Sequence, residues 1–458
     1  MNTNDNIFVC LARKIGMDGA IAYSSAARVF QAFAGVISIF FIATFLTGEE
    51  QGFFYTFGSV LAIQVFFELG FTGIMTQYVA HEAVHLSLNK MQIYEGEIRY
   101  KSRLAYLVRF CIKWYSIVST LFLVVIIIIG FVYFNRFDKT EGLVDWKGPW
   151  LILAIGTAIK LFQSPFTAIF TGLGKVKEMN EILFYQQLVI SISQWVFFVC
   201  GLRLYVVGIS SLLGVTIWFL FIWKMDLWKI LLNLLKEKIT ETISYVNEIF
   251  PYQWKIALSW ISGYFIFQLF NPVLFATEGA VVAGQMGMTL QGLNAIQAFA
   301  MSWESTKIPL YSGLIEMRNY KELDTVFNRT VKQMMIVCTF LLTAMFVVVF
   351  ILKVTHFSIN GKEFGYRFLD YLPMILMMIP IFVNQIIGAW ADYLRCHKKE
   401  PFLVQSVVMG ILCCASTIIL GYNFGIIGIT LGYCCLRLIV ALPWSYLLFV
   451  TKKKEWHQ

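Results

Sequence analysis

The sequence predicts an all-α polytopic membrane protein, with about twelve transmembrane helices in two parallel six-helix repeats around a central cavity. Of its 458 residues, 59% are hydrophobic and only 14% are charged. The mean hydropathy of +0.71 is too high for a chain whose surface faces water. Apolar stretches long enough to cross a bilayer recur along the whole chain, and segments of its two halves resemble each other.

Twelve stretches meet the usual length of about 17–25 mostly apolar residues for a spanning helix. Their approximate limits are 20–46, 53–80, 105–134, 149–172, 182–202, 204–223, 253–276, 280–306, 331–354, 367–392, 401–421 and 424–450. We therefore expect an N-terminal six-helix lobe over 1–223 and a C-terminal one over 251–458. The segment 224–250 between them alternates apolar and basic faces, which is typical of a helix lying in the cytoplasmic membrane interface.

Basic residues indicate the orientation. The loops assigned to the cytoplasm contain about three times as many Lys and Arg as the short external loops, so both termini are expected in the cytoplasm. The net charge of +9 follows from this topology and does not indicate a nucleic-acid partner. Residues 1–18 lack the features of a signal peptide and are expected to be a retained cytoplasmic segment. The cysteines show no metal or disulfide spacing, so we expect core thiols and no cofactor.

Two pairs of segments resemble each other half a chain apart. The segment 45–52 (FLTGEEQG) has a counterpart in 275–284, and 201–209 (GLRLYVVGI) matches 421–429 (GYNFGIIGI) with its glycines at a common offset. Each member of the second pair lies in the turn between the last two spans of its half. Because each half has an even number of crossings, the repeats run parallel and are related by an axis along the membrane normal.

Charged side chains within the predicted spans are candidate functional residues. Arg28, Lys160 and Arg437 lie in the first, fourth and twelfth spans, and Glu68 lies near the middle of the second. Charges inside a membrane are costly and usually face a protein cavity or a ligand. For Arg28 two alternatives remain open: the side chain extends to the headgroups, or it pairs with Glu68. Amide side chains add polarity to other spans: Gln64, Gln163, Gln186, Gln187, Gln268, Asn271, Gln291, Asn294, Gln297, Asn384 and Gln385.

Glu68 is the candidate for ion coupling, because burial raises the pKa of a carboxyl group and lets it load and release a proton. Glu304, Asp370 and Asp392 lie nearer to span ends, and we interpret them as interfacial groups. Proline at 272 is expected to break the seventh helix, since it removes a backbone hydrogen bond.

One motif points to a different class of protein. Residues 81–85 (HEAVH) match H-E-x-x-H, which on a helix can hold zinc and a general base. A membrane zinc protease needs a third ligand, and the remaining histidines offer no clear partner. The motif also lies where the second span leaves the membrane, a common position for His and Glu, so we interpret it as a chance match.

Three strings carry a family resemblance: TGEEQGFFYTFGSVLAIQVFFELGF at 47–71, the basic turn GLGK at 172–175 and YNFGIIGIT at 422–430. These strings occur in this order along the chain, together with twelve spans and parallel halves. By these features the chain resembles a Wzx-type polysaccharide flippase over nearly its whole length. That family lies in the multidrug/oligosaccharidyl-lipid/polysaccharide exporter (MOP) superfamily, with the lipid II flippase and the MATE exporters. The resemblance implies a V-shaped transporter of the bacterial inner membrane, and no enzyme. Its expected substrate is an undecaprenyl-pyrophosphate-linked oligosaccharide (an O-antigen unit of lipopolysaccharide, a capsule or an exopolysaccharide unit), moved by alternating access.

The resemblance also implies roles for residues and partners. A first-helix arginine of lipid II flippases is linked to pyrophosphate binding, and Arg28 is the matching position. We expect Arg28, Lys160 and Arg437 to bind the diphosphate, amides and aromatic faces to bind the sugars, and the prenyl tail to stay in lipid. The implied counter-ion is a proton or sodium, and polysaccharide polymerase and chain-length machinery are candidate partners.

Two other membrane proteins remain as alternatives. A MATE-like cation-coupled exporter of small molecules would share the fold, but it would favour an acidic cavity, whereas three spans here carry cations. A glycan polymerase or ligase would carry a large external loop, and none is predicted here.

Overall fold

The computed structural model describes residues 19–89, 91–397 and 399–457, and the side chains of 19–29, 32, 246, 247 and 252 are not part of that description. The predicted N-terminal cytoplasmic segment, 1–18, lies outside the described residues. The chain forms two compact units. The first contains the chain up to Ala34, Ile63–Tyr133 and Asp145–Ala257, and the second contains Gly35–Ala62, Phe134–Val144 and Leu258–Gln458.

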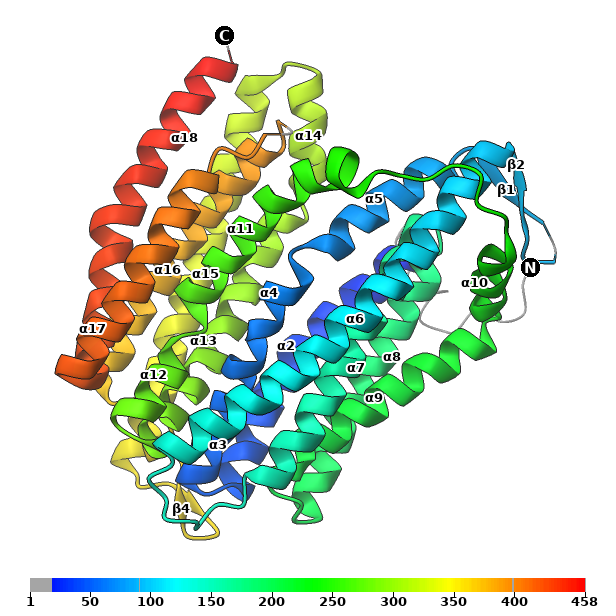
Figure 1. The fold of residues 1–458 in the computed structure, drawn as a ribbon. Coiled ribbons are helices and arrows are strands. Elements are labelled where there is room, and N and C mark those ends of the chain that lie inside the picture. Colours follow the sequence, from blue (N-terminus) through cyan, green and yellow to red (C-terminus); the bar gives the residue numbers. More distant parts are fainter. Residues whose placement is uncertain (1–18, 90, 398, 458) are drawn as a thin grey trace. The chain divides into compact units, whose positions relative to one another are not determined.

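Helices make up most of the described chain (Figure 1). Up to the middle of the chain they are α2 (Gly19–Phe45), α3 (Gly48–Leu61), α4 (Val65–Glu68), α5 (Phe71–Ala83), α6 (Ile98–Phe137), α7 (Lys147–Gly172), α8 (Val176–Val199), α9 (Tyr205–Lys224) and α10 (Leu227–Lys236). They continue as α11 (Phe250–Phe267), α12 (Phe270–Thr277), α13 (Ala280–Ser305), α14 (Ile308–Glu316), α15 (Tyr320–Val354), α16 (Tyr371–Arg395), α17 (Leu403–Cys435) and α18 (Leu442–Trp456).

The predicted spans all overlap helices, and the expected multi-pass membrane protein is confirmed. Among the described residues, seven helices are long and apolar enough to cross a membrane, or up to nine if each bent pair is one span. Helix α13 is long enough but fails this test, because its amide side chains lower its hydropathy. The arrangement of twelve helices in two repeats, with lobes over 1–223 and 251–458, stays a prediction.

Two of the predicted spans are bent. The span predicted over 53–80 as one helix is broken at Leu69 and Gly70, both with positive φ, and bends by 41° between α4 and α5. No proline marks this break, so the sequence did not indicate it. The expected break in the seventh span is confirmed: α11 and α12 meet at an angle of 40°, just before Pro272.

Further along, α17 is interrupted at Gly425, whose φ is 57°, between the predicted eleventh and twelfth spans.

Two short antiparallel hairpins add to the helices and were not predicted. They are β1 (Leu86–Leu88) with β2 (Tyr94–Gly96), and β3 (Ser358–Ile359) with β4 (Lys362–Glu363).

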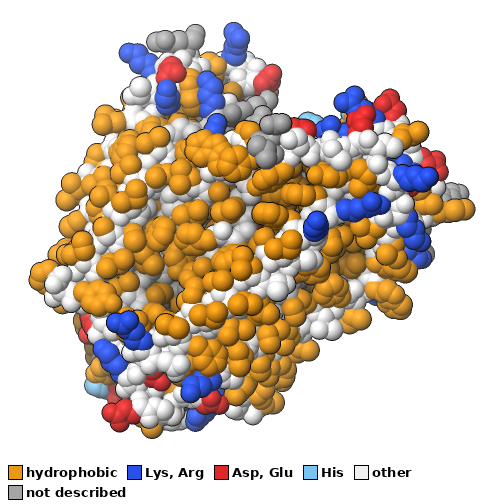
Figure 2. All heavy atoms as spheres, viewed as in Figure 1, with side chains coloured by type: hydrophobic (Ala, Val, Ile, Leu, Met, Phe, Trp, Pro, Cys, Tyr) orange, Lys and Arg blue, Asp and Glu red, His pale blue; other side chains and the backbone are white. Residues whose placement is uncertain are grey.

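Apolar side chains lie exposed in stripes along single helices. On α6 the stripe recurs every three or four residues, at Ile117, Leu121, Val124, Ile128 and Val132. This spacing keeps the stripe on one helix face, which is the pattern of a face that contacts lipid. On the face drawn in Figure 2, hydrophobic side chains cover the middle of the helices and charged side chains gather near their ends.

In the first unit, small residues let helices approach closely. A Cβ atom on Gly208 of α9 would lie 2.9 Å from the backbone nitrogen of Leu153 on α7. Helix α10 has four apolar side chains buried by protein, Leu227, Ile230, Leu231 and Leu234, while Leu232 is exposed. Its amphipathic character is confirmed, and its place in the membrane interface stays a prediction.

In the second unit, α3 and α13 cross in backbone contact. A Cβ atom on Gly52 would overlap the carbonyl oxygen of Ala280, and one on Gly284 would lie 2.8 Å from the nitrogen of Gly52. Gln51 donates hydrogen bonds to the carbonyl oxygens of Gly284 (2.8 Å) and Arg367 (3.0 Å). The segments 45–52 and 275–284, which resemble each other in sequence, thus meet here.

Candidate functional site

A cavity of about 700 Å³ lies within the second unit. Its walls come from α3, the bend between α11 and α12, and helices α13, α16 and α17. The polar residues among its lining are Tyr55, Ser59, Gln268, Asn271, Gln291, Asn294, Gln297 and Tyr433, and none of the described lining residues carries a carboxylate. Phe267, Phe270, Met301, Met377 and Ile381 supply much of the apolar surface.

The bend in the seventh span brings polar groups to this cavity. Gln268 lies at the break itself, and Asn271 follows within the first turn of α12. The side-chain nitrogen of Asn271 donates to the hydroxyl of Ser59 (3.1 Å), while its carbonyl oxygen is buried and has no hydrogen-bond partner among the described residues. A buried acceptor without a partner is costly, so a ligand donor in the cavity would be favourable.

Helices α3 and α13 present further polar groups. The hydroxyl of Tyr55 donates to the side-chain oxygen of Gln291 (2.6 Å), and the nitrogen of Gln291 donates to the carbonyl oxygen of Gly35 (2.9 Å). These contacts fix Gln291, whereas Asn294 one turn further on is exposed. The cavity therefore combines amides held by hydrogen bonds, Asn271 and Gln291, with the exposed amide of Asn294, and such amides suit hydroxyl groups.

Arg437, one of the predicted cations, lies beside this cavity. It belongs to a π-helical turn, Leu436–Ala441, that follows α17, and only 7% of its surface is exposed. Its guanidinium carbon lies 5.4 Å from the ring centroids of both Phe267 and Tyr433, and its Nε donates to the Tyr433 hydroxyl (3.3 Å). No carboxylate among the described residues pairs with it. A buried cation without a counter-ion favours binding of an anion.

Lys160, in the first unit, lies on a polar stripe of α7. Thr157, Lys160, Ser164, Thr167 and Thr171 follow each other at helical spacing, all at least partly exposed. The lysine is exposed and forms no ion pair with a described residue. An apolar stripe on another side of the same helix includes Ile155 and Ile159. Helix α7 therefore has two exposed faces, and only the polar one suits a hydrated cavity.

Glu68, the predicted coupling residue, is the last residue of α4, at the break in the second span. Its carboxylate accepts a hydrogen bond from the hydroxyl of Thr72 (2.6 Å), which lies 3.2 Å from the hydroxyl of Tyr115.

Arg28 lies in α2, but its side chain is outside the described part of the structure. Whether Arg28 pairs with Glu68 or binds pyrophosphate therefore remains a prediction.

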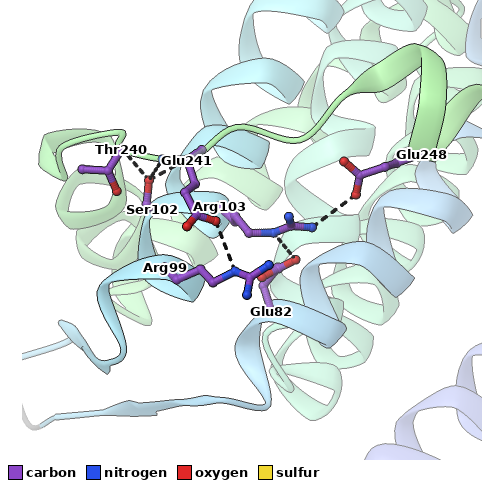
Figure 3. A network of polar contacts seen from close by, with 7 residues as sticks. All are labelled: Glu82, Arg99, Ser102, Arg103, Thr240, Glu241 and Glu248. Atoms are coloured by element: carbon purple, nitrogen blue, oxygen red, sulfur yellow. Dashed lines mark hydrogen bonds and ion pairs between the residues drawn. The ribbon is translucent and has the colours of Figure 1, made fainter.

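The H-E-x-x-H residues form other contacts (Figure 3). Glu82 accepts a hydrogen bond from Nε of Arg103 at 2.9 Å, and Arg103 also reaches Glu248 at 3.3 Å. His85 lies beyond the end of α5, and its ring stacks on Tyr100 with centroids 4.0 Å apart. The glutamate thus has a cationic partner, which agrees with the interpretation of a chance match.

The ion pairs around Glu82 also hold the segment that follows α10. The hydroxyl of Ser102 accepts hydrogen bonds from the backbone nitrogens of Thr240 (2.7 Å) and Glu241 (2.9 Å), as Figure 3 shows. Arg99 pairs with Glu241 at 3.2 Å. The conspicuous motif therefore lies in a network that anchors the linker to α6.

Some residues of the site were not singled out from the sequence. Tyr55 and Tyr433 line the cavity but are two among 21 tyrosines, without a distinguishing local signal. Glu304, interpreted as an interfacial group, has an exposed fraction of 0%. Its position near the end of a span suggested an interfacial group, but burial depends on the helices that pack around a residue.

Solved structures with the same architecture are membrane transporters. A multidrug resistance MATE family transporter of the MOP superfamily, in an inward-facing conformation, matches with a TM-score of 0.56 and 14% identity over 92% of this chain and 99% of its own. The lipid II flippase MurJ, in an inward closed conformation, matches with a TM-score of 0.58 and 14% identity, covering 94% and 87%. This chain has the fold of these transporters.

An outward-facing MATE family transporter also matches this fold, with a TM-score of 0.52, 13% identity, and coverage of 98% of this chain and 100% of its own. No protein-family model and no curated protein sequence matches the chain. Drug exporters and a lipid flippase share this fold, so the fold by itself does not assign a function to this chain.

Proposed function

We propose that this protein is a flippase of the Wzx type, which moves an undecaprenyl-pyrophosphate-linked oligosaccharide across a bacterial inner membrane by alternating access. The observation that carries the proposal is the buried, unpaired guanidinium of Arg437 beside an amide-lined and aromatic-lined cavity. The guanidinium suits a diphosphate, because it can donate two parallel hydrogen bonds to phosphate oxygens.

The rest of the cavity suits a sugar. Amide groups donate and accept hydrogen bonds with hydroxyl groups, and aromatic faces cover the apolar faces of sugar rings. Phe267 and Tyr433 offer such faces next to Arg437. A MATE-like exporter of cationic drugs would instead need a carboxylate here, and none lines the described cavity.

The proposal also gives roles to the cations of other spans. Lys160 is exposed on the polar stripe of α7 and can attract the diphosphate at longer range. Arg28 is assigned to diphosphate binding by resemblance. The prenyl tail stays in the lipid, so only the diphosphate and the sugars need a polar path through the protein.

Binding and flipping by the purified protein test the proposal. The protein is reconstituted into liposomes with a short polyprenyl-diphosphate-linked oligosaccharide, and a lectin outside reports sugar that has crossed. Arg437→Ala should weaken binding by about ten- to a hundredfold, since a charge-assisted hydrogen bond contributes about 1.5–3 kcal/mol. Arg437→Lys should restore only part of it, because the charge remains and the planar fork is lost.

Matched variants separate this effect from a general loss of charge. Lys332→Ala removes an exposed cation of α15 that does not line the cavity and should change nothing. Arg28→Ala should abolish flipping, and Lys160→Ala should reduce it less. Saturable transport of a cationic dye, with no binding of the diphosphate lipid by the wild type, would favour the MATE-like exporter instead.

A further inference from the structure

A carboxyl group is completely buried near the end of α13. Glu304 has an exposed fraction of 0%, and neither of its carboxyl oxygens has a hydrogen-bond partner among the described residues. An ionised carboxylate in this position would lose its hydration without compensation, which is strongly unfavourable. The surroundings therefore accommodate Glu304 in its neutral, protonated form.

No described residue that interacts electrostatically with Glu304 carries a positive charge. Asp392 of α16, Tyr311 of α14 and Cys396 at the end of α16 are the groups that interact with it electrostatically. Asp392 pairs with Arg395 at 3.4 Å, and the arginine also pairs with Glu400 at 2.8 Å. Two neighbouring carboxyl groups repel each other when both are ionised, so the proton is expected on the completely buried Glu304, while the ion pair with Arg395 favours the ionised form of Asp392.

One member of this pair borders a pocket. Asp392 also lines a pocket of about 730 Å³, together with Ser312, Glu316, Arg395 and His397. The pocket lies at the helix ends that the sequence assigns to the cytoplasm. Asp392 therefore interacts with the buried acid on one side and borders the pocket on the other, which is the arrangement of a proton relay.

We propose that Glu304 carries the proton that couples transport to a proton gradient, and that Asp392 passes this proton between Glu304 and the pocket. The proton leaves the Glu304 carboxyl for the Asp392 carboxylate and then for water, and it returns by the reverse steps. Only O–H bonds form and break. The inference rests on the proposed function, and it assigns to Glu304 the role that the sequence predicted for Glu68, whose carboxylate already accepts a hydrogen bond from Thr72.

Glu304→Gln tests the inference, because the amide has nearly the shape of the neutral acid and should fold. In liposomes with a pH gradient, gradient-driven flipping should fall to the rate measured without a gradient, while the affinity for the diphosphate-linked oligosaccharide stays that of the wild type. Asp392→Asn should slow the response to the gradient. Glu322→Gln, at an exposed carboxylate of α15 that does not line this pocket, is the matched control and should behave as the wild type.

Infrared difference spectroscopy provides a readout that needs no substrate. The wild type at pH 7 should show a carboxylic-acid carbonyl band that is missing in Glu304→Gln. Absence of this band from the wild type, a normal gradient response in Glu304→Gln, or flipping driven by sodium alone would each overturn the inference and leave the proposed function intact. Failure of the wild type to flip the lipid would instead contradict the proposed function, while the band still reports on Glu304.

Discussion

His397 and His457 form a contact at the end of the chain that should depend on protonation. Their Nε2 atoms lie 3.3 Å apart, and the ring of His457 stacks on Tyr320 with centroids 3.9 Å apart. Burial lowers the pKa of both histidines, and for His457 the neighbouring imidazole lowers the pKa further. The neutral rings therefore stabilise this contact, which holds the end of α18 near α15 and α16.

Acidification should release this end of the chain. Because the folded-state pKa values lie below the ordinary value of 6.5, the stabilisation is present above about pH 6.5 and is lost as the pH falls through the folded-state values. Asp324, Lys453 and Lys399 also act on these rings, and the lysines oppose a further positive charge. We expect amide hydrogen exchange in the last turn of α18 to be faster at pH 5.5 than at pH 7.5, after correction for intrinsic rates.

Two variants check the origin of this effect. His457→Ala should raise exchange at pH 7.5 and remove most of the pH dependence. Glu455→Gln changes an exposed residue that pairs with Lys452 at 2.6 Å, and this variant should keep the pH dependence of the wild type. Equal exchange at both pH values in the wild type would show that the histidines do not hold this end.

At the scale of single residues, the sequence indicated which charges lie within spans, but it did not indicate their surroundings. Arg437 could be found because a cation inside an apolar stretch is costly wherever it points. The aromatic neighbours of Arg437 could not be predicted, because Phe267 lies far from Arg437 in the chain and meets it only through helix packing. Glu304 shows the converse: its position near a span end suggested exposure, and packing against α14 and α16 made it fully buried.

At the scale of helices, the breaks explain where the chain becomes polar. Pro272 made the bend in the seventh span predictable, because proline lacks the backbone donor. The bend at Leu69 and Gly70 has no such marker, and a single glycine within an apolar span is too common to predict one. Both breaks carry residues of interest, Gln268 at one and Glu68 at the other.

The crossing of α3 and α13 should depend on the absence of a side chain at Gly52. Gly52→Ala would place a methyl group on the backbone of Ala280, and we expect a loss of about 1–3 kcal/mol, measured as a lower melting temperature in detergent. Gly58→Ala lies on the same helix and meets nothing within 4 Å. It should leave the melting temperature unchanged or raise it, since alanine favours a helix more than glycine does. Equal melting temperatures for the two variants would contradict the close crossing.

At the scale of the molecule, composition and span length were sufficient to predict a multi-pass helical membrane protein. They were not sufficient to predict its cavity, because a list of spans does not show which helices pack around a cavity. The sequence match between 45–52 and 275–284 did pair two segments that lie together, since Gly52 and Gly284 are in backbone contact. The symmetry axis that would relate them as repeats stays a prediction.

Orientation in the membrane can be tested by reporters at the two ends of the predicted topology. Basic residues place the end after Lys454 in the cytoplasm, because Lys and Arg are retained on that side. Asp145 is exposed in the loop between α6 and α7, which the same rule places outside. A reporter fused after Lys454 should therefore be active only as a cytoplasmic reporter, and one inserted near Asp145 only as an external one. Finding both on the same side would contradict the odd number of crossings predicted between the external loop at 145 and the cytoplasmic C-terminus. A span would then have to be removed, or the pocket beside Asp392 would lie on the opposite face of the membrane.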